Sequence, residues 1–411
     1  MIFKFLKEGN ICSPSGFLSS SLHCGLKKSG KADLCVLFSE TPALVVGAFT
    51  SNKFCAAPVE VTKKIIERSS RVRAIVVNSG NANACTGKDG IKNAVSMTEI
   101  AAKHLGVSPW EVLVCSTGRI GVQMPMDKIS NGISKACSGL SKEKGSDAAG
   151  AIMTTDLVKK ECAVSFRTSD GKRITIASMT KGSGMIAPKM KTAHPHATML
   201  SFITTDAKID KARLWEIFDS CVSRTFNMIS VDGDMSTNDS VILLANGDAG
   251  NKTIKGKSPD AGKFSEALYA VMTKMAKNIV LDGEGATKFI TIEVSGAKTY
   301  SDAELCARAI SNSMLCKTAW FGGDPNWGRV LAAAGYSGAQ FDQSNVSMKY
   351  NDVPVITKGL PIGTSEEKLA KEVSKKELVV RINLGAGSAK CAMWTCDLSY
   401  EYVKINADYR T

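Results

Sequence analysis

Hydrophobic residues along this chain are grouped in short runs separated by turn-forming residues. Runs rich in Val and Ile and bounded by Gly, Asn, Ser or Pro predict buried strands. Apolar residues three or four positions apart predict helices. The clearest predicted strands are residues 34–50, 72–78, 112–115, 162–167, 173–178, 199–204 and 241–246, and the clearest predicted helices are 88–105, 145–159, 211–228 and 262–280.

The pattern changes near residue 285. Beyond this point the strands and helices predict a smaller strand–helix–strand unit. We therefore expect two domains, a larger one over residues 1–285 and a smaller one over 286–411, since a chain of 411 residues exceeds one ordinary core. The predicted elements of the second unit are strands 289–295, 345–349 and 379–384, a helix at 301–315, and a last strand pair around 391–405.

Composition is that of a globular protein, with 44% hydrophobic and 22% charged residues. No stretch approaches the roughly 18 consecutive apolar residues of a membrane helix. Residues 1–17 have no apolar core followed by a small-residue cleavage site, so they predict a first strand and not a signal peptide. We expect a cytoplasmic protein that does not bind membranes.

The net charge of +13 raises the question of nucleic-acid binding. The lysines and arginines are spread along the chain, without an arginine-rich run and with few interleaved aromatic residues. We therefore expect a solvated basic surface and no nucleic-acid partner. A positive field also attracts small anionic substrates.

Metal and disulfide sites are not expected. The thirteen cysteines are scattered singly, and even Cys391 and Cys396 are too far apart for a CxxC motif, so most are expected to be reduced core residues. His194 and His196 form an HxH pair, but with only His23 and His104 elsewhere a third histidine ligand is not obvious.

Several familiar templates also fail. Residues 250–258 (GNKTIKGKS) resemble a phosphate-binding loop but have five residues between the glycines where four are needed. Residues 283–288 (GEGATK) and 385–390 (GAGSAK) lack the third glycine of a dinucleotide fingerprint, and no GxSxG is present. What remains are Thr-, Gly- and Asn-rich loops after buried strands, which can supply N–H groups to tetrahedral intermediates, although such residues also make ordinary turns.

These loops carry a resemblance to a known family. In its combination and order of motifs the sequence resembles the ornithine acetyltransferase family, also called bifunctional glutamate N-acetyltransferase (ArgJ). The motifs run from near the start to the last residue. They are NSGNANACTG (78–87), STGRIG (116–121), MTTD (153–156), KGSGMIAP (181–188), ATMLSFITTDA (197–207), SVDGDMSTND (230–239), GEGATK (283–288), FGGDPNWGR (321–329) and NADYRT (406–411).

The resemblance implies a precursor that cuts itself between Ala197 and Thr198, giving chains of 197 and 214 residues. The Thr198 hydroxyl attacks the preceding carbonyl, the acyl group shifts from nitrogen to oxygen, and water releases the ester. The new α-amino group has an ordinary pKa of about 8, so it can act as general base for its own Oγ near neutral pH. Without the motif set, Thr198 reads as one of many strand threonines.

The resemblance also implies the other site residues. Thr117 and Gly118 match the oxyanion pair, although Thr-Gly also suits a plain strand-to-loop turn. Lys181 suits a substrate carboxylate and Glu284 an ammonium group, although both also suit solvated loops. Asn406 and Thr411 would reach the site on a docked C-terminal strand. The full set of implied substrate contacts is Thr155, Lys181, Thr198, Glu284, Asn406 and Thr411.

The expected fold is therefore α/β, with mixed, largely antiparallel sheets layered with helices and a smaller C-terminal α/β domain. The expected reaction moves acetyl from N-acetylornithine to glutamate through an acetyl-threonine, with no metal or other cofactor. Acetyl-CoA is a second donor for bifunctional members, and the sequence does not reveal whether it is one here. The resemblance further implies cleaved α and β chains in a dimer of αβ pairs. The rival readings are an N-terminal-nucleophile aminopeptidase or amidase, and a non-catalytic basic binding protein.

Overall fold

One large sheet forms the centre of the first unit. In the part of the chain that the computed structural model describes (residues 2–188, 190 and 199–408), nine strands form this sheet in the order β1-β6-β7-β8-β10-β3-β4-β5, with β2 on β3. The β8–β10 and β4–β5 pairs are parallel and the other neighbours are antiparallel. The strands are β1 (Lys4–Phe5), β2 (Phe17–Leu22), β3 (Leu34–Phe49), β4 (Arg71–Asn81), β5 (Val112–Arg119), β6 (Lys160–Arg167), β7 (Arg173–Lys181), β8 (Leu200–Thr205) and β10 (Ser240–Ala245).

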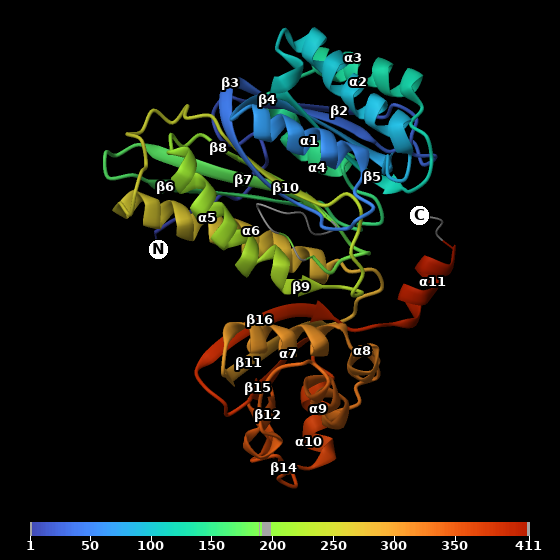
Figure 1. Cartoon of the computed structure of the whole chain (residues 1–411), viewed down its shortest axis with the longest axis vertical. Helices are drawn as coiled ribbons and strands as arrows, with labels where there is room; N and C mark the ends of the chain where they lie inside the picture. The colour runs from blue at the N-terminus through green and yellow to red at the C-terminus, as the bar shows by residue number, and fades with distance from the viewer. Residues whose placement is uncertain (1, 189, 191–198, 409–411) are drawn as a thin grey trace.

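Helices cover both faces of this sheet (Figure 1). Successive side chains of a strand point to opposite faces, and β10 shows the result. Val241 and Leu243 pack in the cluster that contains α5 and α6, whereas Ile242 and Leu244 pack in the cluster that contains α1 to α4. The helices are α1 (Ala57–Arg68), α2 (Gly87–Leu105), α3 (Met126–Ser138), α4 (Gly145–Ala151), α5 (Lys211–Arg224) and α6 (Pro259–Leu281).

The second unit lies below the first in Figure 1 and has a sheet of its own. Among the described residues this sheet has seven strands, in the order β14-β13-β12-β15-β11-β16-β9, and helix α7 packs on β11 and β16. Its elements are β9 (Ile229–Ser230), β11 (Phe289–Ala297), β12 (Ser347–Tyr350), β13 (Val353–Thr357), β14 (Leu360–Pro361), β15 (Glu377–Asn383), β16 (Ala389–Cys396), α7 (Tyr300–Asn312), α8 (Met314–Gly322), α9 (Trp327–Gly335) and α10 (Glu366–Val373).

The fold class expected from the sequence is confirmed, since both units layer helices on mixed, largely antiparallel sheets. The expected boundary near residue 285 falls between α6 and β11. The short strand β9 precedes that boundary in sequence and nevertheless pairs with β16 of the second sheet. The division into two domains stays a prediction.

Three predicted elements were wrong. The first strand expected over residues 1–17 is reduced to β1 (Lys4–Phe5), and β2 begins only at Phe17. The helix expected over 145–159 ends at Ala151, because the carboxylate of Asp156 accepts a hydrogen bond from Thr154 N and forms a turn instead. The strand expected up to residue 405 ends at Cys396, and helix α11 (Tyr400–Asp408) follows. This segment has no strand partner, and a helix satisfies its backbone groups internally.

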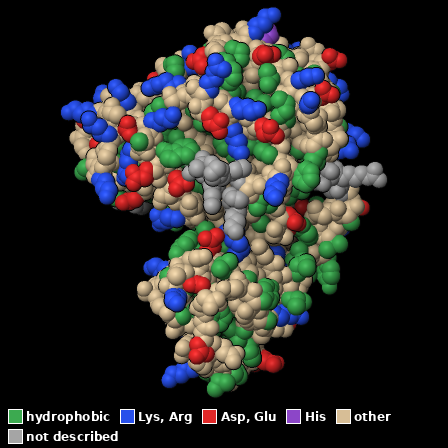
Figure 2. Space-filling model, in the orientation of Figure 1, with side chains coloured by type: hydrophobic (Ala, Val, Ile, Leu, Met, Phe, Trp, Pro, Cys, Tyr) green, Lys and Arg blue, Asp and Glu red, His purple; other side chains and the backbone are tan. Residues whose placement is uncertain are grey.

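The surface agrees with the dispersed charge of the sequence. On the face shown in Figure 2, lysines and arginines are interspersed with aspartates and glutamates and form no single basic stripe. None of the helices in the described part of the chain combines the length and the apolar character needed to cross a lipid bilayer. All thirteen cysteines are described and are free thiols, ten of them buried.

Candidate active site

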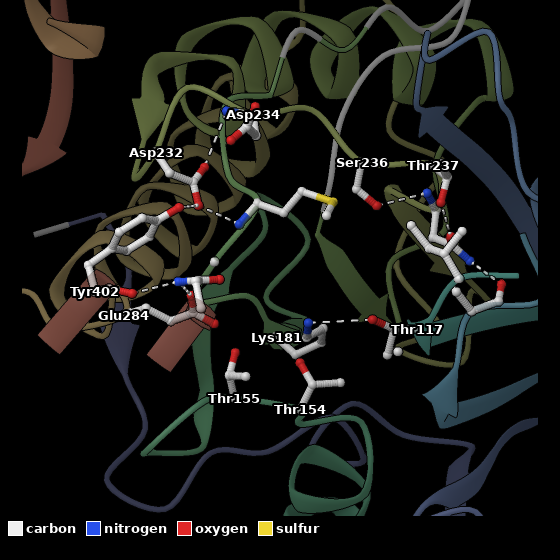
Figure 3. A pocket seen from close by; sticks show the side chains of 17 residues that line it. Thr117, Thr154, Thr155, Lys181, Asp232, Asp234, Ser236, Thr237, Glu284 and Tyr402 are labelled. Atoms are coloured by element: carbon white, nitrogen blue, oxygen red, sulfur yellow. Dashed lines mark hydrogen bonds between the residues drawn. The ribbon is translucent and has the colours of Figure 1, made fainter. Parts of the chain in front are cut away.

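A pocket lies where loops from both units meet (Figure 3). Its walls come from the ends of β5 and β7, the turn after α4, the segment between β9 and β10, the turn after α6, and helix α11. These elements are far apart in the sequence, and the order of the strands in the sheets brings them together. The lining residues are Ala82, Thr117, Gly118, Ile120, Thr154, Thr155, Lys181, Gly184, Met185, Asp232, Asp234, Ser236, Thr237, Asn238, Glu284, Tyr402 and Asn406.

Thr117 and Gly118 form the end of β5 in this pocket. Gly118 has φ of 129°, and a Cβ there would lie 2.6 Å from the backbone nitrogen of Asn81 on the neighbouring strand. The close pairing of β4 and β5 therefore requires glycine at this position. The Thr117 hydroxyl accepts a long hydrogen bond of 3.5 Å from Lys181 Nζ. A threonine hydroxyl next to a glycine N–H is a candidate pair of donors for an oxyanion.

Asn238 connects the segment that follows β4 to strand β5. Its side-chain amide donates to the carbonyl oxygens of Ala82, at 2.6 Å, and of Ser116, at 2.8 Å. Asn238 is buried, so these bonds are shielded from water. The oxyanion candidates are thus fixed from behind by a side chain that also lines the pocket.

Lys181 brings a buried positive charge to the pocket. It is the last residue of β7 and is only 5% exposed. Burial lowers the pKa of Lys181 below its ordinary value, against the opposing charges of Asp156, Asp239 and Glu284. Burial alone would raise the pKa of Asp156, but the charges of Lys181 and Lys160 bring it down to about 2. Lys181 therefore places a buried amino group in the pocket wall, where an anionic group of a small molecule would stabilise its protonated form.

Asp232, Glu284 and Tyr402 lie together on the left of the pocket in Figure 3, away from Thr117. Asp232 accepts hydrogen bonds from Met185 N at 2.6 Å and from Ile186 N at 2.8 Å, and the Tyr402 hydroxyl donates to it at 3.3 Å. Burial raises the pKa of Asp232. Glu284 accepts a hydrogen bond of 2.9 Å from the amide of Asn406. This side is suited to a cationic group.

Asp239 lies behind the pocket without a hydrogen-bond donor. It is fully buried, and neither of its carboxyl oxygens accepts a hydrogen bond from any residue in the described ranges. Burial raises the pKa of Asp239 well above its ordinary range, although the charge of Lys181 opposes this shift. A buried acid of this kind costs stability, and such groups gather at functional sites.

Six residues singled out from the sequence line this one pocket: Thr117, Gly118, Thr155, Lys181, Glu284 and Asn406. Three others, Ala197, Thr198 and Thr411, lie outside the described residues, as do His194 and His196. Met199, which follows Thr198, is described, and its carbonyl oxygen accepts a hydrogen bond of 2.7 Å from Ser240 N. The roles of all these residues stay proposals.

The sequence did not single out Asp232, Asp234, Asn238 or Tyr402. The first three lie in SVDGDMSTND, which was noted as a motif without assigning a residue to the site. Tyr402 precedes the final NADYRT motif and carries no signal of its own. No group of three or more His, Cys, Asp or Glu side chains among the described residues is arranged to hold a metal ion.

Comparison with known proteins gives consistent matches over the chain. The sequence model of the ArgJ family matches residues 18–411. The arginine biosynthesis bifunctional protein ArgJ of Symbiobacterium thermophilum is 47% identical over 405 residues, covering 98% of this chain and 99% of the relative. That of Caldanaerobacter subterraneus is 49% identical over 408 residues, again 98% and 99% of the two chains. A crystal structure of ArgJ from Bacillus halodurans matches with a TM-score of 0.50 and 42% identity, covering 52% of this chain and 100% of that chain.

Proposed function

The chain belongs to the ArgJ family of arginine biosynthesis, and from this premise we propose that it moves an acetyl group from N-acetylornithine to glutamate with Thr198 as the nucleophile. It is an enzyme with glutamate N-acetyltransferase activity. The assignment of the individual residues is our own proposal, and it rests on the pocket described above.

The convergence of the predicted residues carries this proposal. Thr117, Thr155, Lys181, Glu284 and Asn406 are separated by up to 289 positions, yet all line the same pocket. The rival reading, a non-catalytic protein that binds through a basic surface, does not predict that these residues line one pocket. A cation and a carboxylate on opposite sides of a pocket fit an amino acid, which carries both charges.

Self-cleavage between Ala197 and Thr198 is part of the proposal. Cleavage there gives an α chain of 197 residues and a β chain of 214 residues, and the latter is 52% of the 411 residues. The Bacillus halodurans chain is matched over its full length and also covers 52% of this chain. A relative with a polypeptide of half length supports processing of the precursor into two chains.

The proposed chemistry needs only groups of this chain and water. The Thr198 Oγ attacks the Ala197 carbonyl, the C–N bond breaks, and the hydroxyl proton passes to the departing nitrogen. The acyl group now sits on Oγ as an ester and the α-amine of Thr198 is free; water then hydrolyses the ester, which releases the Ala197 carboxylate and restores the Thr198 hydroxyl. This amine takes the proton from Oγ as Oγ attacks the acetyl carbon of N-acetylornithine, and ornithine leaves with that proton. Glutamate attacks the acetyl-threonine in the second half of the cycle.

Thr117 and Gly118 are proposed to bind the oxyanion in both half-reactions. Lys181 is proposed to hold a carboxylate of the substrate, because it is the buried cation of the pocket. Glu284 is proposed to hold an ammonium group, with Asn406 fixing its carboxylate. Thr155 and Thr411 complete the proposed set of substrate contacts.

An intact mass measurement tests the proposal. Purified protein is expected as two chains, and N-terminal sequencing is expected to find a fragment that begins Thr-Met-Leu-Ser. The variant Thr198→Ala is expected as a single uncut chain of 43.7 kDa without transferase activity. Cleavage and activity in Thr198→Ala would contradict the assignment of the nucleophile.

An acceptor assay separates transfer from the rival hydrolysis by an aminopeptidase or amidase. Release of ornithine from N-acetylornithine is expected to rise steeply with glutamate concentration. Release that is independent of glutamate would favour the hydrolase. The same assay with acetyl-CoA in place of N-acetylornithine shows whether this chain also accepts the second donor.

The proposal includes an assembly and a location. We propose that two αβ pairs form the active particle and that it resides in the cytoplasm, where small-molecule substrates of amino-acid biosynthesis are made. Light scattering is expected to give a particle of about twice the 43.7 kDa chain mass. A particle of single chain mass would contradict the dimer.

A further inference from the structure

Lys160 is a fully buried lysine that lies behind the pocket without lining it. It is the first residue of β6 and is 0% exposed. Its Nζ donates a hydrogen bond of 2.7 Å to Asp156 Oδ1 and a second, shorter one to Asp282 Oδ2. Both carboxylates are buried as well. The ammonium group and the two carboxylates are all shielded from water. Removing Lys160 or one of the aspartates would leave a buried charge without its partner, which is strongly destabilising.

Asp156 connects Lys160 to two walls of the pocket. Its carboxylate accepts hydrogen bonds from Thr154 N at 2.9 Å and from Gly182 N at 2.7 Å. The first of these fixes the turn that carries Thr155, and the second fixes the backbone next to Lys181. The two nitrogens bond to different oxygens of Asp156, so both hydrogen bonds are strongest when this carboxyl group is ionised.

Asp282 connects Lys160 to a third wall. Its carboxylate accepts from Leu157 N at 3.1 Å, and its carbonyl oxygen accepts from the Ser183 hydroxyl. Glu284 N in turn donates to the Ser183 carbonyl oxygen at 2.9 Å. The segment that carries Glu284 is therefore tied to the same buried lysine as the segments that carry Thr155 and Lys181.

We propose that Lys160 is a positioning residue that sets the spacing of Thr155, Lys181 and Glu284, and thereby the fit of the pocket to an amino acid with its carboxylate at one end and its ammonium group at the other. This inference rests on the proposed function. Lys160 does not touch the substrate. It acts by keeping the Asp156 and Asp282 carboxylates together, which would repel each other without a cation between them.

Because positive charges surround Asp156, the proposed role of Lys160 predicts a change in the pH at which Asp156 takes up a proton. Asp156 faces Lys160 from β6, Lys181 from β7 and Lys27 from the loop before β3, while Asp282 shares the Lys160 ammonium group. With Lys160 removed, protonation of Asp156 takes place at higher pH. Ornithine binding is then lost on acidification at a higher pH than in the parent, which a loss of packing alone does not produce.

The test compares Lys160→Met with a matched control, Lys317→Met. Lys317 is a second buried lysine, 2% exposed, which lies on α8 and donates to Thr395 Oγ1 at 3.0 Å and to the Cys396 carbonyl oxygen. It does not line the pocket. Both variants lose a buried ammonium group and its packing. We expect Lys160→Met alone to lose about 10- to 100-fold in kcat/KM, mostly through KM, as misplacement of binding groups predicts.

Ornithine binding by calorimetry is the second readout, because it needs no turnover and no cleavage. Weaker ornithine binding in Lys160→Met, lost on acidification at a higher pH than in the parent, with neither change in Lys317→Met, is the expected result. If Lys160→Met does not fold, Lys160→Gln, which removes the charge and keeps a hydrogen-bond donor, is measured instead. Ornithine affinity and its pH dependence equal to those of the parent in the folded variant would overturn the proposal.

The parent protein separates the two possible failures. If the parent is neither cleaved nor active, the proposed function fails, whatever Lys160 does. If the parent transfers acetyl normally and the Lys160 variant matches it, only the positioning role fails.

Discussion

The side-chain amide of Asn406 donates a 2.9 Å hydrogen bond to Oε2 of Glu284, although 122 positions separate the two residues. Helix α11, which carries Asn406, has no buried residue. Polar contacts connect it to the pocket, among them Tyr402 to Asp232 and Ser399 to the Gly285 carbonyl oxygen. Helix α11 is therefore part of the pocket wall and is held there chiefly by hydrogen bonds.

The pair Asn406–Glu284 can be tested with a double-mutant cycle. We expect Glu284→Gln to weaken ornithine binding by about 10- to 100-fold, because it removes a charged hydrogen-bonding group. Asn406→Ala should weaken it by about 3- to 10-fold, the effect of one neutral partner. If Asn406 acts through Glu284, the double variant is no weaker than Glu284→Gln. Strictly additive losses would mean that the two residues act separately.

Thr117→Val tests the oxyanion site. Loss of one hydroxyl donor is expected to reduce kcat by about 100- to 1,000-fold with little change in KM. Thr62→Val is the matched control. Its hydroxyl is also buried and donates to Val114 O of β5 at 2.7 Å, but it lies outside the pocket. A similar fall of kcat in both variants would point to general damage of β5.

Gly285→Ala tests the attachment of α11. Gly285 has φ of 69°, and a Cβ there would lie 2.6 Å from Tyr402 N. We expect the variant to displace α11 and raise KM for N-acetylornithine. Gly338→Ala is the control, because Gly338 has φ of 81° but open space around a new Cβ. It carries the same backbone strain, about 1 kcal/mol, without the clash. Equal KM values in the two variants would contradict the role given to α11.

Asp156 should contribute to stability in a defined pH range. Its pKa of about 2 in the folded protein lies below the ordinary value of 3.8, so its contribution is present above pH 3.8 and is lost as pH falls toward 2. This contribution is about 2 kcal/mol. In urea unfolding, the deficit of Asp156→Asn relative to the parent is therefore expected to shrink between pH 5 and pH 3. A deficit that is constant with pH would show that folding does not lower the pKa of Asp156.

The sequence predicted the strands better than it predicted what surrounds the pocket. Buried runs such as 72–78 and 241–246 are recognisable because a strand inside a sheet is apolar over its whole length. Asp232 was missed because its partners, Met185 N and Ile186 N, are backbone groups 46 to 47 positions away, which no periodicity reveals.

Residues 400–408 were given the wrong structure for a related reason. Their alternation of Tyr, Val and Ile with charged residues suits a strand, but they pair with no strand in the described part of the chain, and the backbone closes its hydrogen bonds as a helix. The local pattern of apolar and charged residues shows only the propensity of a segment for strand or helix. Whether the segment forms a strand also depends on a neighbouring strand with which it can pair.

The order of the large sheet places β8 and β10 between β7 and β3. A cut after Ala197 would leave β7 and β3 on one fragment and β8 and β10 on the other, so each fragment alone would present two long unpaired strand edges. Synthesis as one polypeptide delivers the halves in equal number and already interleaved. If the two halves were made from separate genes, each would expose these unpaired edges before it met the other and would be prone to aggregate. Synthesis as one chain avoids this exposure.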